Sequence, residues 1–525
     1  MWLRAAGRTT LRGVKRILGI LLAFALLPAS AAHADFVDHF AVSDDIGAAK
    51  VPAFGTSRIV VITIEVAGFQ PLRRQNLEAF FAPDPEPGAR NFNDFYERTS
   101  LGAYHTEVDV LEPLQFDSCP LPETYFGYAN CEIPRGGGDT ANQKLESLDV
   151  GLALVELIFE RIDAEQDVDF SRYDLNGPDG EPDGWIDGVL LMHNINFGGI
   201  ALPIHLLRRE RGALEYDGVK INIVGISEDE LVALHEYGHL LGFADLYDEL
   251  RTTKGYQYSY MGSWQYDSDP PALDGFSRIA AGWAQPMVVG PGEERKDVRL
   301  RPTADTADIL QLGQGMEYFL LENRGAVGDD YIDGDLLDRG LAITHVNLDK
   351  YPDGRPDTWP IRLINCLNCE RWEPLLMNEQ ADGKFELQKP GNRRDDLGDL
   401  FQPGDSFGPS SDGTKLSDDF QELSSNYYDG AASGVSVTNI RYDGDDILVD
   451  VKVEEPCASI DCPCGCAEGR CIAECEEPDA GGDADADVGV EPDVEDDVPA
   501  TPASKKGGCA ASGEPAGWRG VWRRR

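Results

Sequence analysis

The sequence predicts an α+β protein whose first half mixes helices and strands and whose second half is rich in β-strands. A β-branched run at residues 58–66 (RIVVITIEV) is typical of a buried strand. Residues 139–165 carry apolar side chains at alternating steps of three and four, which is helical spacing. From about Lys296 the chain changes to short apolar runs separated by turns. Helices and strands do not alternate strictly, which favours α+β over a doubly wound sheet.

Further strands are expected at residues 185–194 and 219–224, so the first folded part is predicted to span residues 56–295. Residues 296–455 are expected to form a β-rich domain that packs on the first. The short runs that predict its strands are residues 308–312, 318–322, 341–346, 435–440 and 447–453.

Length and charge exclude several classes of protein. A chain of 525 residues is expected to form several folding units. The hydrophobic fraction of 42% and the charged fraction of 26% are globular values, which argues against wholesale disorder and against a multi-span membrane protein. The net charge of −47 argues against nucleic acid as a partner, because phosphates require a basic surface.

The first 34 residues have the three parts of a secretory signal peptide. Basic residues come first, an apolar run follows at residues 17–27, and small residues precede Asp35. The alternative is a membrane anchor, but the run is too short to span a bilayer. We therefore expect residues 1–34 to be removed and the protein to be secreted. Residues 35–55 are expected to be a short pro-segment or a linker.

The stretch that indicates chemistry is residues 234–248, LHEYGHLLGFADLYD. Ser227 and Glu230 have the spacing of a capping box, which predicts that a helix starts there and continues to about Leu241. Gly242 would then permit the tight turn that ends this helix.

His235 and His239 are four residues apart and therefore project from one face of the predicted helix, as a tetrahedral Zn²⁺ site requires. Glu236 can accept the proton of a metal-bound water, and the turn can bring Asp245 back as a third ligand. The alternative is a structural helix with surface histidines. Together with export, the motif predicts a secreted zinc metalloendopeptidase that acts on protein or peptide substrates, with Glu236 as the general base.

The same stretch resembles the zinc site of the immune inhibitor A-like secreted metalloproteases, whose motif is His-Glu-x-x-His-x-x-Gly-x-x-Asp. Further segments resemble blocks of that family, so the resemblance covers roughly residues 56–453. These segments are residues 93–100, 258–264, 276–283 and 318–324, with weaker matches at 380–384 and 399–401. The pro-segment departs from the family because it is short.

The resemblance implies a zincin- or metzincin-like catalytic domain at residues 56–295, followed by the β-rich domain. It implies that His235, His239 and Asp245 bind the metal and that Glu236 is the base. Asp248 is the alternative third ligand. Met261 would lie in a methionine turn beneath the metal; the alternative is an ordinary core methionine.

A second cation is expected in an acidic loop. Oxygen-bearing residues around a central glycine suit Ca²⁺, although their spacing is irregular for an EF-hand. The alternative is a polar turn before the strand that follows. The candidate calcium ligands are Asp174, Asn176, Asp179, Asp183 and Asp187.

Export makes the cysteines disulfide candidates before metal ligands. Two groups consist of cysteines close in sequence, and six more crowd residues 456–475, where a disulfide module is predicted and a zinc cluster is the alternative. The candidates are Cys119, Cys131, Cys366, Cys369, Cys457, Cys462, Cys464, Cys466, Cys471 and Cys475.

The C-terminal end is expected to be a tail outside the folded core. Residues 476–506 are acidic with few large apolar side chains, which predicts a disordered stalk. Residues 507–525 resemble the Gly-Gly-Cys sorting tails of myxobacterial surface proteins in degenerate form, which leaves attachment to the cell surface through Cys509 as a hypothesis. Two alternative functions stay open: a calcium-dependent adhesin with a vestigial protease site, and a zinc amidase acting on cell-wall material.

Overall fold

The computed structural model describes residues 51–455 with interruptions, together with residues 466–467 and 470–471. The interruptions are residues 86–87, 121–140, 196–198, 205–207, 209–211, 249–254, 263–268, 326, 329, 335, 349–370, 390–396 and 411–413. The predicted signal peptide, stalk and tail therefore lie outside the described residues, as do residues 35–50. In the described part, no helix has both the length and the apolar character needed to cross a membrane.

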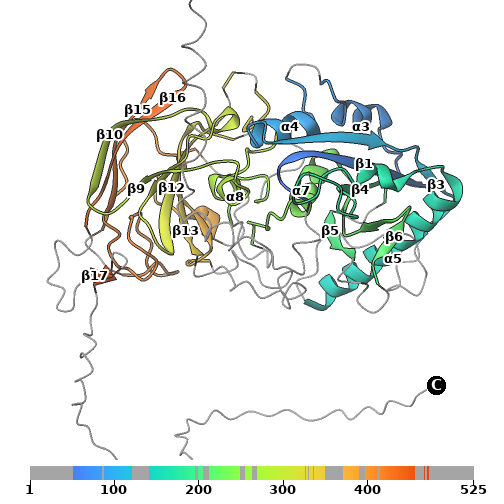
Figure 1. Ribbon diagram of the computed structural model, residues 1–525. Coiled ribbons are helices and arrows are strands. Elements are labelled where there is room, and N and C mark those ends of the chain that lie inside the picture. Colours follow the sequence, from blue (N-terminus) through green and yellow to red (C-terminus); the bar gives the residue numbers. More distant parts are fainter. Residues whose placement is uncertain are drawn as a thin grey trace, which may run out of the picture. The chain divides into compact units, whose positions relative to one another are not determined.

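The first half is built on a mixed six-stranded sheet. Its strands are β1 (Gly55–Val66), β2 (Tyr104–Val110), β3 (Leu114–Phe116), β4 (Gly188–His193), β5 (Ile200–Pro203) and β8 (Ile223–Ser227). They lie in the order β2-β1-β4-β8-β5, and β3 also pairs with β1 (Figure 1). All pairs are parallel except that of β5 with β8, so β5 is an antiparallel edge strand.

Helices cover both faces of this sheet. The helices are α3 (Arg74–Phe80), α4 (Phe92–Thr99), α5 (Ala141–Glu165) and α7 (Glu230–Leu240). Val60 and Ile62 of β1 share a core with α5, whereas Ile59 and Val61 share a core with α4 and α7. Successive strand residues point to opposite faces, so the central residues Ile59–Ile62 of β1 are all apolar because both faces are buried there. The predicted strand at residues 58–66 and helix at 139–165 are confirmed.

The single strand predicted at residues 219–224 is wrong. Residues 219–221 form β7 (Val219–Ile221), which pairs with β6 (Leu214–Tyr216) in a hairpin, and β8 starts at Ile223. The hairpin turn is Asp217-Gly218, and both residues have positive φ angles, 52° and 84°. Such turns favour Asp-Gly because its residues tolerate left-handed backbone. Asn222 separates the two strands and accepts a hydrogen bond from the backbone N–H of Ile223.

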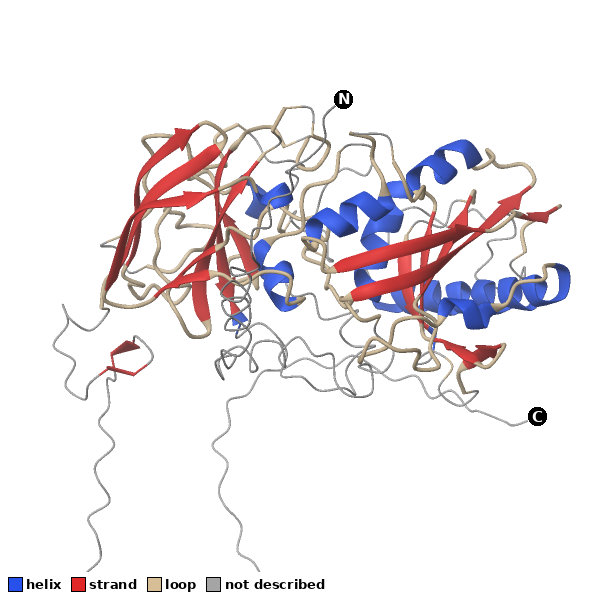
Figure 2. Ribbon diagram, turned by 45° about the horizontal axis from the view of Figure 1, so that its top comes forward, coloured by secondary structure: helices blue, strands red, loops and turns tan. Residues whose placement is uncertain are grey.

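The second half consists mainly of two sheets, which confirms the predicted β-rich character (Figure 2). One sheet has the order β14-β13-β12-β11-β9 and the other the order β10-β16-β15. Their strands are β9 (Met287–Val289), β10 (Glu293–Leu300), β11 (Leu310–Leu312), β12 (Glu317–Arg324), β13 (Gly340–Asn347), β14 (Leu376–Glu379), β15 (Val435–Asp443) and β16 (Asp446–Val453).

The five-stranded sheet joins the two halves into one core. Phe319 and Ile343 point from it toward the three-stranded sheet. Tyr318 and Leu320 point the other way, into the cluster that also contains α7 and the short helix α8 (Gly275–Ala280). Because adjacent residues of β12 supply both cores, the predicted boundary at residue 295 does not divide the hydrophobic interior.

A buried histidine connects three neighbouring strands of this sheet. His345 on β13 lies between Glu317 of β12, at 2.9 Å from its Nε2, and Glu379 of β14, at 3.1 Å from its Nδ1. The ring of Tyr428 stacks on the imidazole with 4.0 Å between centroids. Burial lowers the pKa of His345, but hydrogen bonds to the two carboxylates outweigh burial and raise it above the ordinary value. Burial also raises the pKa of Glu379.

This cluster predicts that stability falls as the pH rises. A group whose pKa is raised on folding stabilises the fold fully below its unfolded pKa, about 6.5 for histidine, and that contribution is lost as the pH rises through the folded pKa. Guanidinium unfolding between pH 6 and pH 9 should show this loss in the wild type and a smaller one in His345→Gln. Parallel losses in the two proteins would contradict the assignment.

Candidate metal centre

Helix α7 presents the motif residues, and its N-cap lies two residues later than the predicted cap at Ser227. Its N-cap is Asp229, whose side chain accepts a hydrogen bond from the backbone N–H of Leu231 at 2.8 Å. Ser227 still belongs to β8 and hydrogen-bonds Asp229. The predicted capping box is therefore wrong, because the strand runs up to Ser227 and leaves the cap to the next suitable side chain.

Three predicted ligands converge on one point. Asp245 Oδ1 lies 3.0 Å from His235 Nε2 and 3.3 Å from His239 Nε2. The three ligand atoms all lie within 4.8 Å of one another. The helix ends at Leu240 with Leu241 as its C-cap, and Gly242, with a φ angle of 92°, turns the chain back so that Asp245 reaches the histidines. This turn is the one the sequence predicted.

Backbone carbonyls fix the orientation of both imidazoles. His235 Nδ1 donates to the carbonyl of Tyr260 at 2.9 Å, and His239 Nδ1 donates to the carbonyl of Phe243 at 2.8 Å. With one proton held on Nδ1, the Nε2 atom of each imidazole faces Asp245 and would supply the lone pair that binds a metal ion. Two imidazole nitrogens and one carboxylate oxygen, with a position left over, form a donor set that fits a Zn²⁺ ion with an exchangeable water.

The electrostatics of the site are those of a buried group of opposite charges. Burial alone would raise the pKa of Asp245, but His239 and His235 beside it lower it far below the usual range. Burial lowers the pKa of His239, but the charge of Asp245 outweighs burial and raises it to about 9. The centre therefore favours a carboxylate next to positive charge, whether that charge is a proton or a metal ion.

Glu236 lies beside this group on the same helix and is 5% exposed. Burial raises its pKa to about 7. Such a value suits a general base near neutral pH. A Cβ on Gly199, next to strand β5, would come within 2.4 Å of Glu236 Oε1, so only a residue without a side chain fits there.

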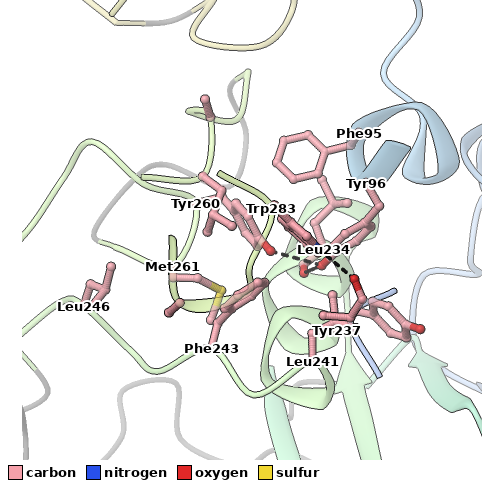
Figure 3. Packing of buried hydrophobic residues seen from close by; sticks show 14 of the residues in the cluster. Phe95, Tyr96, Leu234, Tyr237, Leu241, Phe243, Leu246, Tyr260, Met261 and Trp283 are labelled. Atoms are coloured by element: carbon pink, nitrogen blue, oxygen red, sulfur yellow. Dashed lines mark hydrogen bonds between the residues drawn. The ribbon is translucent and has the colours of Figure 1, made fainter. Parts of the chain in front are cut away.

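The predicted methionine turn lies under the helix. Met261 is fully buried, and its sulfur lies 2.5 Å from where a Cβ on Gly238 would be, so glycine at 238 permits the close approach. Its carbonyl accepts a hydrogen bond from the N–H of Leu246, next to Asp245. Figure 3 shows Met261 beside Phe243 and Tyr260. Met261 therefore packs in the buried core cluster that also contains the apolar residues of α7.

A cluster of buried tyrosines, which the sequence did not predict to act together, also packs against this helix. The hydroxyl of Tyr96 on α4 donates to the carbonyl of Leu234 at 2.6 Å, and the hydroxyl of Tyr260 lies 3.4 Å from that of Tyr96 (Figure 3). Tyr104 and Tyr237 share a hydrogen bond of 2.5 Å. The aromatic residues in and near the segment 93–100 are visible in the sequence. Their contact with Tyr237 and Tyr260, which are distant in the chain, is formed only by the fold.

Asp248, the alternative third ligand, is buried at 2% exposure. It is absent from both groups of converging ligand atoms found in the described residues. The geometry therefore favours Asp245.

The five calcium candidates do not converge. Asp174 accepts backbone hydrogen bonds from Asp183 and Gly184, and Asp187 accepts them from Arg58, Leu175 and Asn176. Asp179 and Asp183 likewise accept from the backbone N–H two residues on. Among the described His, Cys, Asp and Glu residues, no group of converging ligand atoms contains any of the four aspartates. The structure favours the alternative interpretation, a polar turn before β4, because these oxygens hold the turn itself.

A second acidic group was not predicted as a site. Ligand atoms of Asp382, Glu386 and Asp399 lie within 4.8 Å of one another, between β14 and β15. Lys384 Nζ lies 2.5 Å from Asp382 Oδ2 and supplies one balancing positive charge.

Most of the disulfide candidates lie outside the described residues. Cys119 is disulfide-bonded. Cys466 and Cys471 face each other across the two-residue strands β17 (Cys466–Ala467) and β18 (Arg470–Cys471). The remaining candidates, Cys131, Cys366, Cys369, Cys457, Cys462, Cys464 and Cys475, lie outside the described residues.

Comparison with known proteins adds no assignment. No protein-family model matches the chain, and no curated protein matches its sequence. The resemblance to the immune inhibitor A-like metalloproteases therefore stays a prediction that depends on the motif and the blocks named above.

The two aspartates give a direct test of the ligand set. Asp245→Asn should weaken Zn²⁺ binding by more than the about 10–100-fold that typically follows loss of an outer-shell partner, because it removes a coordinating charge. Asp248→Asn, the matched control, should keep wild-type affinity. Competition against a fluorescent chelator measures the Zn²⁺ affinity of both variants. A larger loss of affinity in Asp248→Asn than in Asp245→Asn would make Asp248 the third ligand.

Proposed function

We propose that the protein is a secreted zinc-dependent endopeptidase with a zincin-like catalytic part at residues 56–295. The observation that carries this proposal is the convergence of His235, His239 and Asp245 beside a buried Glu236 on the same helix. Two imidazoles, one carboxylate and a neighbouring carboxylate that is not a ligand are the parts of a metal-dependent hydrolase.

The chemistry divides between the ion and the chain. A bound Zn²⁺ would polarise the scissile carbonyl and acidify the attacking water. Glu236 would take the proton of that water and then deliver it to the leaving amine. The Tyr260 and Phe243 carbonyls would hold the imidazoles in the tautomer that binds metal through Nε2.

Strand β5 supports a peptide as the substrate. It is the last strand in the order of its sheet within the described residues, so its outer edge offers backbone groups to a further strand. Gly199, directly before β5, lies against Glu236. An extended peptide that adds to this edge by backbone hydrogen bonds would pass close to the base. This supports an endopeptidase over the amidase hypothesis, which requires the same metal site but no strand-like substrate.

Secretion and the alternative function as a calcium-dependent adhesin depend on other parts of the chain. Secretion rests on the signal-like residues 1–34, which lie outside the described part of the chain. The adhesin hypothesis lacks support among the described residues, because the calcium candidates are used in a turn.

Exchange of the base tests the function. Glu236→Gln should retain zinc and lose at least about 10²–10⁴-fold in the rate of casein hydrolysis, because the attacking water loses its proton acceptor. Glu230→Gln makes the same chemical change in the first turn of the same helix, away from the ligands, and should keep activity. Chelation should abolish wild-type hydrolysis, and added Zn²⁺ should restore it.

Three outcomes would contradict the proposal. They are wild-type protein that binds no zinc, equal hydrolysis by Glu236→Gln, and release of cell-wall amides without hydrolysis of casein. The last result would instead support the amidase.

A further inference from the structure

A completely buried ion pair lies where the second half meets the metal centre. Arg324, the last residue of β12, is 0% exposed, and Asp333 is 2% exposed. The guanidinium forms two hydrogen bonds with the carboxylate, Nε to Oδ2 at 2.8 Å and Nη2 to Oδ1 at 2.6 Å. Burying two charges is costly unless their remaining hydrogen-bonding groups also find partners.

The remaining partners are backbone groups, of which all but the N–H of Gly325 belong to the first half. Arg324 Nη1 donates to the carbonyl of Tyr258 at 2.5 Å, and Nη2 also donates to the carbonyl of Ala272 at 3.3 Å. Asp333 Oδ1 accepts from the N–H of Ala272 at 2.7 Å. The ion pair therefore hydrogen-bonds to the first half at two positions, Tyr258 and Ala272, that are far from Arg324 in sequence.

One of these points leads directly to a metal ligand. Two residues after Tyr258, the carbonyl of Tyr260 accepts the Nδ1 proton of His235 at 2.9 Å. The intervening turn is closed by a hydrogen bond from the N–H of Gly262 to the carbonyl of Ser259 at 2.8 Å. Tyr258 directly precedes this turn, and its carbonyl is two peptide units from that of Tyr260. A displacement of the Tyr258 carbonyl therefore moves the backbone that carries the acceptor of His235, so the site of Arg324 bears on the orientation of His235.

The same turn reaches the third ligand. The carbonyl of Met261 accepts a hydrogen bond from the N–H of Leu246 at 2.9 Å, and Leu246 follows Asp245. The turn between Tyr258 and Gly262 therefore contacts both arms of the metal centre, one through a side-chain hydrogen bond and one through the backbone.

We propose that Arg324 and Asp333 are positioning residues for the metal centre: by holding the Tyr258 carbonyl, the second half sets the backbone acceptor that orients His235. The inference rests on the metal site of the proposed function but not on the peptidase reaction. It gives the β-rich half a role in metal binding, which a purely structural tether would not have.

A second ion pair supplies the matched control. Arg98 on α4 forms hydrogen bonds of 3.0 and 2.5 Å with Asp330 of the second half. This pair also joins the two halves, but its hydrogen bonds do not involve the turn at Tyr258–Gly262. Loss of either pair should lower the apo protein's melting temperature, whereas only loss of the first should change the metal centre.

The experiment compares Arg324→Lys and Arg98→Lys with the wild type, all as full chains. Lysine keeps the charge but loses the planar fork that Arg324 uses. We expect Arg324→Lys to weaken Zn²⁺ binding by about 10–100-fold and to change the visible absorption spectrum of the Co²⁺-loaded protein. Arg98→Lys should keep the wild-type Zn²⁺ affinity and Co²⁺ spectrum. Chelator competition and absorption are measured below the melting temperature of every variant.

Asp333→Asn serves if Arg324→Lys fails to fold, since it keeps the shape of the carboxylate and weakens its hold on Arg324. Wild-type Zn²⁺ affinity and Co²⁺ spectrum in the folded variant would overturn the inference. So would equal losses of affinity in Arg98→Lys, because the effect would then follow stability alone. The proposed function would survive either of these results if the wild type binds zinc and the Glu236→Gln variant loses activity. Wild-type protein that does not bind zinc would overturn both the inference and the proposed function.

Discussion

The metal centre depends on two hydrogen bonds from imidazole nitrogens to backbone carbonyls. The carbonyls of Tyr260 and Phe243 hold the Nδ1 protons of His235 and His239, which leaves both Nε2 atoms facing Asp245. Because the acceptors belong to the backbone, the geometry depends on where two turns of the chain lie. The buried tyrosines, Gly238 and the close approach of Met261 all serve to fix those turns against helix α7.

The spacing of residues along the chain allowed the three candidate ligands to be predicted. Features that depend on packing between distant segments could not be predicted in this way. The four-residue spacing of His235 and His239 and the glycine at 242 specify one helix face and one turn, so Asp245 could be placed from sequence. The cap at Ser227 failed because the preceding strand includes that residue. The long strand at residues 219–224 failed because an Asp-Gly turn and Asn222 divide apolar residues that look continuous.

Other features leave no trace in residue spacing. The acceptor of His235 is a main-chain oxygen. Any residue at that position could supply it, so its role leaves no pattern of residue types in the sequence. Arg324 and Asp333 act from more than fifty residues beyond the turn that they hold. The acidic loop is ambiguous in sequence for a related reason, because oxygens spaced as calcium ligands also suit Asx-type turns such as those that Asp174 forms here.

The alternation of buried residues along β12 has a consequence for how such a chain can be divided. Tyr318 and Leu320 fill one core while Phe319 and Leu321 fill another, so the strand has no surface that belongs to solvent. A fragment that ends at residue 295 would expose to water the apolar side chains of the first half that pack against β12 and β13. An exposed apolar surface of this kind favours aggregation. The first half is therefore not an independent module: recombination with other accessory domains would have to retain the five-stranded sheet that covers its core.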